Sequence, residues 1–410
     1  MNRRELLTAG VVVGLTGCVG GERGISSRND TPRNDTPQND TPRLLTEKKT
    51  SESEVESPTF YSSYDGKPYD GIDWDTYGRR KGQFHIHPHY GNLGPPQEVY
   101  DHYVELGYDI LCIQPKDDLQ HGMPWPLDEI GDTLDQWENR YPAEDGVVAI
   151  AGAEYTDTQH ISGFFTDLMQ KELKDELGSG SMDNPGHQYD TVEQIVLSES
   201  TLETGSPLAF IGHPGRYKEE MSQDEWETEW LSNYEQMIED FDRLLGLEAI
   251  TYSFAYDDRE TWDTLLGDAV PDRPVIGTSV DDIGEYEDAD RGWVTFYLSP
   301  EEFTPAEQQA TREHVYEAWV SGRTSFSTTK EPGTGAPIIE RIDRDEDAGT
   351  ISLRASGHDV IEWVSDGDVI ETGETIEYRD NTDVGPYIRA QIIEGDPQDP
   401  DSITCTQAWY

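Results

Sequence analysis

Phe84-His85-Ile86-His87-Pro88-His89 is the stretch of this 410-residue chain that decides its fold and its chemistry. Its β-branched and aromatic residues favour a short β-strand. Successive side chains of a strand point to opposite faces, so His85 and His87 project to the same face. Two imidazoles side by side at a strand end are how many metal sites begin. The stretch therefore predicts a metal site, provided that further ligands follow neighbouring strands.

Short apolar segments alternate with amphipathic helical patterns over residues 61–330. Such alternation favours an α/β fold with a parallel sheet and right-handed crossovers, either open or closed into a barrel. In a barrel of this kind, functional side chains gather at the carboxyl ends of the strands. The expected strands are Gln83–His87, Asp109–Gln114, Val147–Ala151, Ile161–Phe165, Leu208–Gly212, Leu247–Thr251, Pro274–Thr278 and Trp293–Leu298. The expected helices include Gln97–Leu106, Thr191–Glu203, Asp224–Leu245 and Pro305–Ser321.

The pattern changes over residues 331–410, where short strand-like segments follow one another without a helical period. Asp-Gly, Gly-Asp and Asn-Thr turns separate these segments, which is typical of antiparallel sheets. This part of the sequence predicts a small antiparallel β-sandwich domain after the barrel. The expected strands are Ile338–Ile342, Thr350–Ala355, Val360–Val364, Thr375–Tyr378, Tyr387–Ile393 and Thr404–Tyr410.

The first residues resemble an export signal. Arg3 and Arg4 precede a short apolar run, Ala9–Leu15, which is too short to span a bilayer stably. The pair resembles a twin-arginine signal, and Leu15-Thr16-Gly17-Cys18 resembles a lipobox in which Cys18 becomes the lipidated N-terminus. We therefore expect residues 1–18 to be a lipoprotein signal, with the mature protein exported and held at the outer face of the cell membrane.

Residues 19–60 are rich in Thr, Pro, Asn and Asp and carry almost no apolar periodicity. This composition cannot bury a core and predicts a disordered tether. The tether contains a repeat that is also an Asn-x-Thr sequon, so an unmodified spacer and a glycosylated one both fit. The repeats are Asn29–Pro32, Asn34–Pro37 and Asn39–Pro42.

The chain is strongly acidic, with 84 Asp and Glu against 30 Lys and Arg and a net charge of −54. The acidity is spread along the sequence, which is typical of halophilic proteins. No basic stripe is available to neutralise phosphates, so nucleic acid is disfavoured as a partner. Apart from Cys18, only Cys112 and Cys405 are cysteines, and their separation predicts no disulfide framework.

Polar residues follow several of the predicted strands and complete the candidate metal site. Glu154 comes just after one strand, and His160 opens the next. His213 ends a later strand, and Asp281-Asp282 end another. One histidine in a strand is most simply a hydrogen-bonded core residue. Four of the ten histidines placed at strand ends, together with carboxylates, favour a metal site instead.

These motifs resemble the PHP (polymerase and histidinol phosphatase) domain family over the region from Gly82 to about Leu298. The resemblance implies a distorted seven-stranded β/α barrel with metal-dependent phosphoesterase activity. The family's His-x-His matches His85-Ile86-His87, its Gly-x-Glu matches Gly152-Ala153-Glu154, its His before an Ile/Leu-x-Gly strand matches His160, its His-Pro matches His213-Pro214, and its Asp-Ala-His matches Asp282-Ile283-Gly284. The implied metal ligands are therefore His85, His87, Glu154, His160, His213 and Asp282.

Three positions depart from the family's pattern. An Asp of the family is Asn92 here, a ligand His is Lys116, and the final His is Gly284. In three-metal members these positions belong mainly to one metal centre, so the resemblance implies a site reduced to two divalent ions. The Lys116 ammonium would lie near the vacated position, although a Lys that points into solvent remains the alternative. Zn, Mn and Fe all suit His and carboxylate ligands.

The expected reaction is hydrolysis of a phosphate mono- or diester in a small phosphorylated substrate. Lys116, Arg216 and Asp281 are the candidate catalytic residues. Arg216 could hold a substrate phosphate through a bidentate contact, or it could form a structural ion pair in this acidic protein. Two other functions fit the sequence: a degenerate barrel that binds a ligand without turnover, and a metal-dependent hydrolase of another bond such as an amide.

Overall fold

The computed structural model describes residues 64–88, 90–114, 142–166, 168, 170–178, 180, 184–198, 206–218 and 221–410. The predicted signal and tether, as well as His89 and Lys116, lie outside these residues. The chain divides into two units between Val55 and Glu56, and everything below concerns the second unit.

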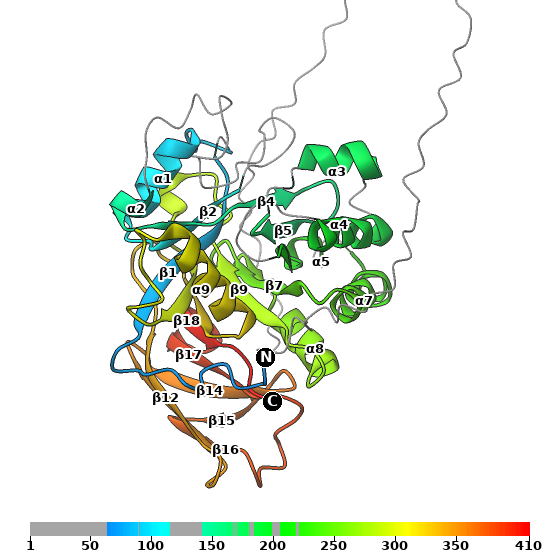
Figure 1. The fold of residues 1–410 in the computed structure, drawn as a ribbon. Helices are drawn as coiled ribbons and strands as arrows, with labels where there is room; N and C mark the ends of the chain where they lie inside the picture. The colour runs from blue at the N-terminus through cyan, green and yellow to red at the C-terminus, as the bar shows by residue number, and fades with distance from the viewer. Residues whose placement is uncertain are drawn as a thin grey trace, which may run out of the picture. The chain divides into compact units, whose positions relative to one another are not determined.

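A nine-stranded mixed sheet runs through the second unit (Figure 1). Its strand order is β15-β14-β17-β18-β11-β10-β1-β2-β3. Strands β1, β2 and β3 pair in parallel, whereas β1 pairs antiparallel with β10. The bounds are β1 Gly78–Ile86, β2 Ile110–Ile113, β3 Val148–Ala149, β10 Gly292–Leu298, β11 Thr324–Thr329, β14 Val360–Ser365, β15 Asp368–Thr372, β17 Arg389–Asp396 and β18 Asp399–Thr406.

A six-stranded sheet carries the remaining strands of the predicted barrel region. Its order is β4-β5-β6-β7-β8, and β9 pairs with β7. Pairs β6–β7 and β7–β9 are parallel, whereas β4–β5 and β5–β6 are antiparallel. The bounds are β4 Gly152–Tyr155, β5 Ile161–Phe164, β6 Leu208–Ile211, β7 Leu244–Thr251, β8 Tyr256–Asp257 and β9 Ile276–Val280.

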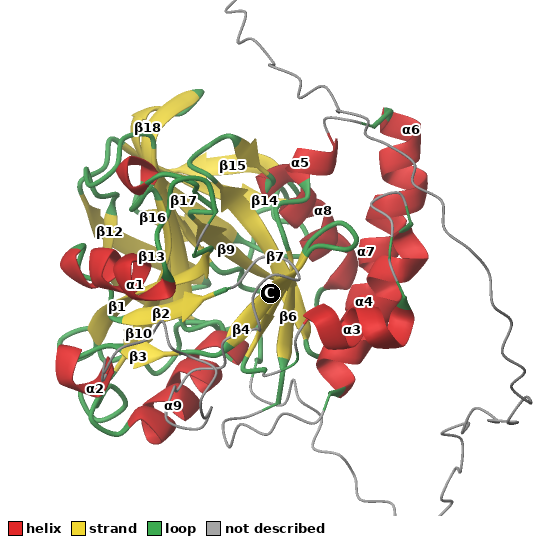
Figure 2. Cartoon of the chain, turned by 90° about the horizontal axis from the view of Figure 1, so that it is seen from above, coloured by secondary structure: helices red, strands yellow, loops and turns green. Residues whose placement is uncertain are grey.

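Helices cover the six-stranded sheet. Figure 2 shows α3, α4, α7 and α8 side by side, and α4, α7 and α8 contact strands of this sheet. Helix α9 packs on β3 and β10, and α1 packs on β2. The bounds are α1 Pro96–Glu105, α2 Pro142–Asp145, α3 Gln170–Leu177, α4 Pro185–Leu197, α5 Gly215–Lys218, α6 Gln223–Glu225, the π-helix η3 Trp226–Leu231, α7 Ser232–Asp240, α8 Arg259–Ala269, the 3₁₀ helix η4 Tyr286–Asp288 and α9 Gln308–Val320.

The α/β class is confirmed, but none of the sheets among the described residues closes into a barrel. Antiparallel pairing explains part of the difference from the predicted parallel sheet. Strands β4 and β5 are joined by residues 156–160, too few for the crossover that parallel strands need. The predicted helix Asp224–Leu245 is also too long, because the chain already enters β7 at Leu244.

The last part of the chain forms two layers of antiparallel strands. A three-stranded sheet, β12 (Ile338–Asp345), β13 (Thr350–Ser356) and β16 (Thr375–Glu377), shares one apolar core with β14 and β17. Strand β18 pairs with β11, so the predicted boundary near residue 331 falls inside a continuous sheet. A separate domain over residues 331–410 therefore stays a prediction.

An aromatic cluster packs the two large sheets together beneath the His-x-His segment. The Trp319 ring of α9 lies 4.4 Å from Phe84 of β1 and 5.0 Å from both Phe164 of β5 and Phe210 of β6, measured between ring centroids. Trp319 and Phe84 are almost fully buried. Because Phe84 and His85 are neighbours on one strand, the cluster fixes the face from which His85 projects.

A buried ion pair connects the last strands to α8. The Arg389 Nη2 atom lies 2.6 Å from Asp263 Oδ2, and the Tyr387 hydroxyl donates to Asp263 Oδ1 at 2.7 Å. All three residues are largely buried. Removing one member of a buried pair leaves the other charge uncompensated, so this contact ties β17 to α8.

We predict that Trp319→Ala lowers the free energy of unfolding by about 3–5 kcal/mol, because the large ring fills the space between the sheets. Chemical denaturation measures the change. Leu197→Ala is the control: this side chain is 65% exposed at the end of α4 and should change the free energy by less than about 0.5 kcal/mol. Equal effects of the two substitutions would contradict the assigned core.

Candidate metal centre

Six side chains from five strands converge into one buried cluster. His85 lies on β1, Glu154 on β4, and His87, His160, His213 and Asp282 stand beside strand ends. Three ligand groups form, in each of which one atom per residue lies within 4.8 Å of the others. The groups are His85/His87/Glu154, His85/His213/Asp282 and Glu154/His160/His213. The structure thus brings together all six of the predicted ligands.

Glu154 is the centre of the cluster. Its Oε1 atom lies 3.2 Å from His85 Nε2 and 3.4 Å from His213 Nε2, and it contacts His160 Nδ1. Its Oε2 atom lies 3.2 Å from His87 Nε2. One carboxylate therefore faces four imidazoles. The sequence placed Glu154 after a strand that ends at Ala151, but the chain changes sheets there and Glu154 lies within β4.

The two histidines of the His-x-His pair have their tautomers set by neighbouring oxygens. His85 Nδ1 lies 2.7 Å from Glu248 Oε1, and His87 Nδ1 lies 2.9 Å from the backbone oxygen of Gln114. A carbonyl oxygen only accepts, and so does a carboxylate, so Nδ1 carries the proton in both rings. The Nε2 atoms of the two rings are left to face each other at 2.8 Å.

Two imidazole lone pairs at this distance repel each other unless a cation or a proton lies between them. The arrangement therefore fits a metal ion, with Nε2 of each ring as ligand and Nδ1 held by an outer oxygen. The donor set of imidazole nitrogens and carboxylate oxygens suits Zn, Mn and Fe. Asp282 Oδ1 adds to the fit, because it is buried and makes no hydrogen bond within the described residues. His87 Nε2 lies 3.4 Å from this oxygen.

Two of the candidate ligands have strained backbones. His213 has φ 27° and Asp282 has φ 42°, both in the left-handed region that residues with a Cβ rarely adopt. Each follows the end of a parallel strand, β6 and β9 respectively. The backbone N–H of Asp282 donates to the His85 oxygen at 3.1 Å, which anchors one of these turns to β1. Strain of this kind is concentrated at functional sites, where the surrounding structure holds it.

The electrostatics of the cluster follow from its composition. Burial would lower the pKa of His85, but nearby carboxylates, Glu248 first, hold that pKa well above its ordinary value. Burial would raise the pKa of Glu154, but the imidazoles around it, His160 first, hold that pKa well below its ordinary value. The pKa of Asp282 is lowered against burial in the same way, chiefly by His85. The cluster therefore favours ionised carboxylates and attracts positive charge.

Glu248 is a site residue that the sequence reasoning missed. It lies on β7, is 1% exposed, and contacts the His85 ring. The sequence does carry a signal for it: Glu248 is the single charged residue in the otherwise uncharged, buried strand Leu244–Thr251. A buried carboxylate in such a strand needs a partner, and here the partner is a candidate metal ligand.

The predicted catalytic residues differ in their placement. Arg216 lies half-buried on α5, just after His213, where the carboxylate of Asp282 acts on its charge. Asp281 is not brought into the cluster: its carboxylate accepts the backbone N–H of Arg291 at 2.9 Å and the hydroxyl of Tyr103 at 2.7 Å. These bonds hold the turn before β10, which is a structural task. Lys116 lies outside the described residues.

Two of the three positions that depart from the family pattern are neighbours in space. The backbone N–H of Asn92 donates to the Gly284 oxygen at 2.7 Å. The Asn92 side chain is exposed and donates to Glu285 at 2.7 Å. These two replaced residues thus lie at one place in the structure.

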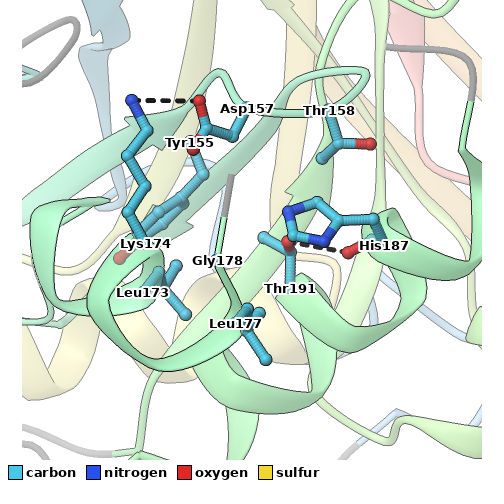
Figure 3. Close-up of a pocket in the computed structure, with 9 residues that line it drawn as sticks. All are labelled: Tyr155, Asp157, Thr158, Leu173, Lys174, Leu177, Gly178, His187 and Thr191. Atoms are coloured by element: carbon cyan, nitrogen blue, oxygen red, sulfur yellow. Dashed lines mark hydrogen bonds and ion pairs between the residues drawn. The ribbon is translucent and has the colours of Figure 1, made fainter. Parts of the chain in front are cut away.

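The loop between Glu154 and His160 lies next to α3 and α4. A small cavity separates the loop from these helices (Figure 3). Asp157 of the loop pairs with Lys174 of α3 at 2.9 Å across it. The cavity is lined by Tyr155, Asp157, Thr158, Leu173, Lys174, Leu177, Gly178, His187 and Thr191. These contacts fix the loop whose two ends carry cluster ligands.

Comparisons with known proteins find similarity only among solved structures. The sequence matches no protein-family model, and no curated protein matches it. Among solved structures, it is similar to a two-domain protein from Bacteroides vulgatus ATCC 8482, described as containing a predicted PHP-like metal-dependent phosphoesterase. The identity is 14% and the TM-score 0.39, over 82% of this chain and 96% of that one.

The chain is also similar to PsfC from Pseudomonas syringae PB-5123, with 14% identity and a TM-score of 0.35. That likeness covers 62% of this chain and 93% of PsfC. Because both TM-scores lie below 0.5, neither likeness carries weight for the function. Within the described residues, no helix is long and apolar enough to cross a membrane.

We predict that protein stripped with a chelator and then titrated with Zn²⁺ or Mn²⁺ binds two ions per chain. His160→Ala should keep one ion, because His160 belongs to only one of the three ligand groups. Glu154→Ala should lose both, because the carboxylate is shared between two groups that have no other member in common. Isothermal titration and elemental analysis give the stoichiometry. Wild-type protein that binds no metal, or Glu154→Ala protein that still binds two ions, would contradict the assignment.

Proposed function

We propose that this protein is a metal-dependent phosphoesterase that hydrolyses a phosphate mono- or diester at a site of two divalent ions. The observation that carries the proposal is Glu154, whose two carboxylate oxygens face imidazoles on both sides of the cluster. A shared carboxylate of this kind can hold two cations close together. His85, His87 and Asp282 would hold one ion, and His160 and His213 the other.

A pair of bound cations supplies an activated water and stabilises the attacking and leaving oxygens of an in-line displacement. The chain's own residues hold the ligand side chains in place. Glu154 keeps the two ligand sets at a fixed separation. Glu248 fixes the His85 ring, and the Gln114 carbonyl fixes the His87 ring. The burial of these side chains limits water around the reacting oxygens and strengthens every charge interaction in the site.

Arg216 is the residue that we propose to bind the substrate phosphate. Its guanidinium lies 6.0 Å from the Tyr217 ring centroid, and the carboxylate of Asp282 acts on its charge. Among the described residues, no carboxylate lies within ion-pair distance of Arg216, which favours phosphate binding over the structural ion pair. An arginine fork matches two phosphate oxygens.

We propose further that the family's third metal centre is lost, because Asn92 and Gly284 replace its ligands and lie side by side. Lys116 would supply positive charge near that position. The export, the lipid anchor at Cys18 and the tether over residues 19–60 are proposals drawn from the sequence alone. They would place the barrel-like region at the outer face of the membrane, where its substrate would be a small phosphorylated molecule.

We predict that the purified protein hydrolyses p-nitrophenyl phosphate or its bis-ester, and that a chelator abolishes this activity. His87→Ala and Glu154→Gln should reduce turnover to background, because each removes a ligand from the cluster. Asp263→Asn, a substitution outside the cluster, is the control and should retain turnover in folded protein. Release of p-nitrophenolate is measured by absorbance.

The outcomes separate the candidate functions. Two bound ions without hydrolysis of either ester would favour the hydrolase of another bond, such as an amide. Metal-free protein without hydrolysis would favour the degenerate barrel that binds a ligand, and it would overturn the proposed activity.

We predict that Arg216→Ala raises KM for the phosphate ester about 10- to 150-fold, the equivalent of about 1.5–3 kcal/mol for a charged hydrogen bond. Arg216→Lys should recover only part of this, because a lysine makes no bidentate contact. Metal stoichiometry is the internal control and should stay at the wild-type value in both variants. An unchanged KM in Arg216→Ala would remove Arg216 from substrate binding.

A further inference from the structure

The carboxylate of Glu248 is a buried acid in contact with the cluster, and it belongs to none of the three ligand groups found among the described residues. It comes from the middle of the six-stranded sheet, on a strand that is buried along its whole length. An ionised carboxylate is costly to bury unless its oxygens are hydrogen-bonded. The way in which those oxygens are used shows what the residue does.

The two oxygens of Glu248 serve two different candidate ligands. Oε1 accepts the Nδ1–H of His85 at 2.7 Å and the hydroxyl of Ser162 at 3.1 Å. Oε2 accepts the backbone N–H of His213 at 3.1 Å and lies 3.5 Å from the hydroxyl of Thr251. One carboxylate thus holds the ring of one ligand and the backbone of another.

We propose that Glu248 is a positioning residue of the metal site, setting the tautomer of His85 in one ligand set and the backbone turn at His213 in the other. The inference deepens the proposed function and rests on the metal site proposed above. Glu248 would not touch a metal ion. It would act through the two histidines, keeping one ligand of each ion in place.

The tautomer of His85 follows from the acceptor beside it. A carboxylate cannot donate, so it stabilises the ring with the proton on Nδ1 and leaves the lone pair of Nε2 for the cluster. With the other tautomer, Nε2 would carry a hydrogen and could not bind a metal. The short contact to Glu248 therefore decides which nitrogen is the ligand.

The backbone of His213 needs support for a different reason. Its φ of 27° is a strained conformation that costs on the order of 1–3 kcal/mol and persists only when surrounding contacts hold it. The charged hydrogen bond from the His213 N–H to Glu248 is such a contact. The preceding residue is held as well, since the Gly212 N–H donates to the His160 oxygen at 2.9 Å.

Glu248→Gln is the decisive substitution because it keeps the shape but converts one acceptor into a donor. If the amide nitrogen faces His85, the ring must take the wrong tautomer. If it faces His213, two N–H groups oppose each other and the strained turn loses its support. Either orientation damages one ligand, so we expect the affinity for Zn²⁺ to fall about 10- to 100-fold.

The experiment measures Zn²⁺ affinity of the full chain by competition with a chromophoric chelator. Asp263→Asn is the matched control, since it also turns a buried carboxylate into an amide but its partners are Arg389 and Tyr387. Its affinity should stay at the wild-type value. Equal affinities of wild type and Glu248→Gln would overturn the inference while leaving the metal site intact. Wild-type protein without Zn²⁺ affinity would instead overturn the metal site and this inference with it.

A second measurement on wild-type protein decides the question even if Glu248→Gln does not fold. Imidazole ¹⁵N spectra report which nitrogen of each histidine carries the proton. We expect His85, identified by the signal lost in His85→Gln, to show a protonated Nδ1 before and after Zn²⁺ is added, with Zn²⁺ changing the Nε2 shift. An unprotonated Nδ1 in His85, or a metal bound at Nδ1, would overturn the inference.

Discussion

The contact on which the site depends is that between one buried carboxylate, Glu154, and the imidazoles of His85, His87, His160 and His213. Burying so many charged and polar groups is costly unless the nitrogens and oxygens bind cations or share protons. The rest of the fold provides that match. The aromatic cluster around Trp319 holds the two sheets together, and oxygens from neighbouring strands fix the outer nitrogens of the His-x-His pair.

The clustering of the six candidate ligands could be predicted from the sequence because they sit in short motifs at strand ends. His85 and His87 follow from strand periodicity, and His213 and Asp282 follow apolar runs of strand length. The predicted α/β class is confirmed, but the described residues do not close the predicted distorted barrel. Apolar runs do not reveal whether neighbouring strands pair in parallel or antiparallel. The sheet change at Ala151 was equally hidden, since one continuous apolar run supplies strands to two sheets.

The roles of adjacent acids could not be predicted either. Asp281 and Asp282 are neighbours after the same strand, yet their carboxylates have different partners. Asp282 has a φ of 42° and its carboxylate lies in the cluster, whereas the carboxylate of Asp281 accepts hydrogen bonds from the turn before β10. Glu248 lies far along the chain from both histidines that it contacts. Such contacts depend on which strands become neighbours, and local sequence patterns carry no record of that.

Crystals grown with Mn²⁺ and phosphate, measured for anomalous scattering, test the central claim most directly. The account predicts two anomalous peaks bridged by Glu154, one bound by His85 and His87 and the other by His160 and His213, with a phosphate oxygen near Arg216. A single peak away from Glu154, or no peak within the cluster, would contradict it.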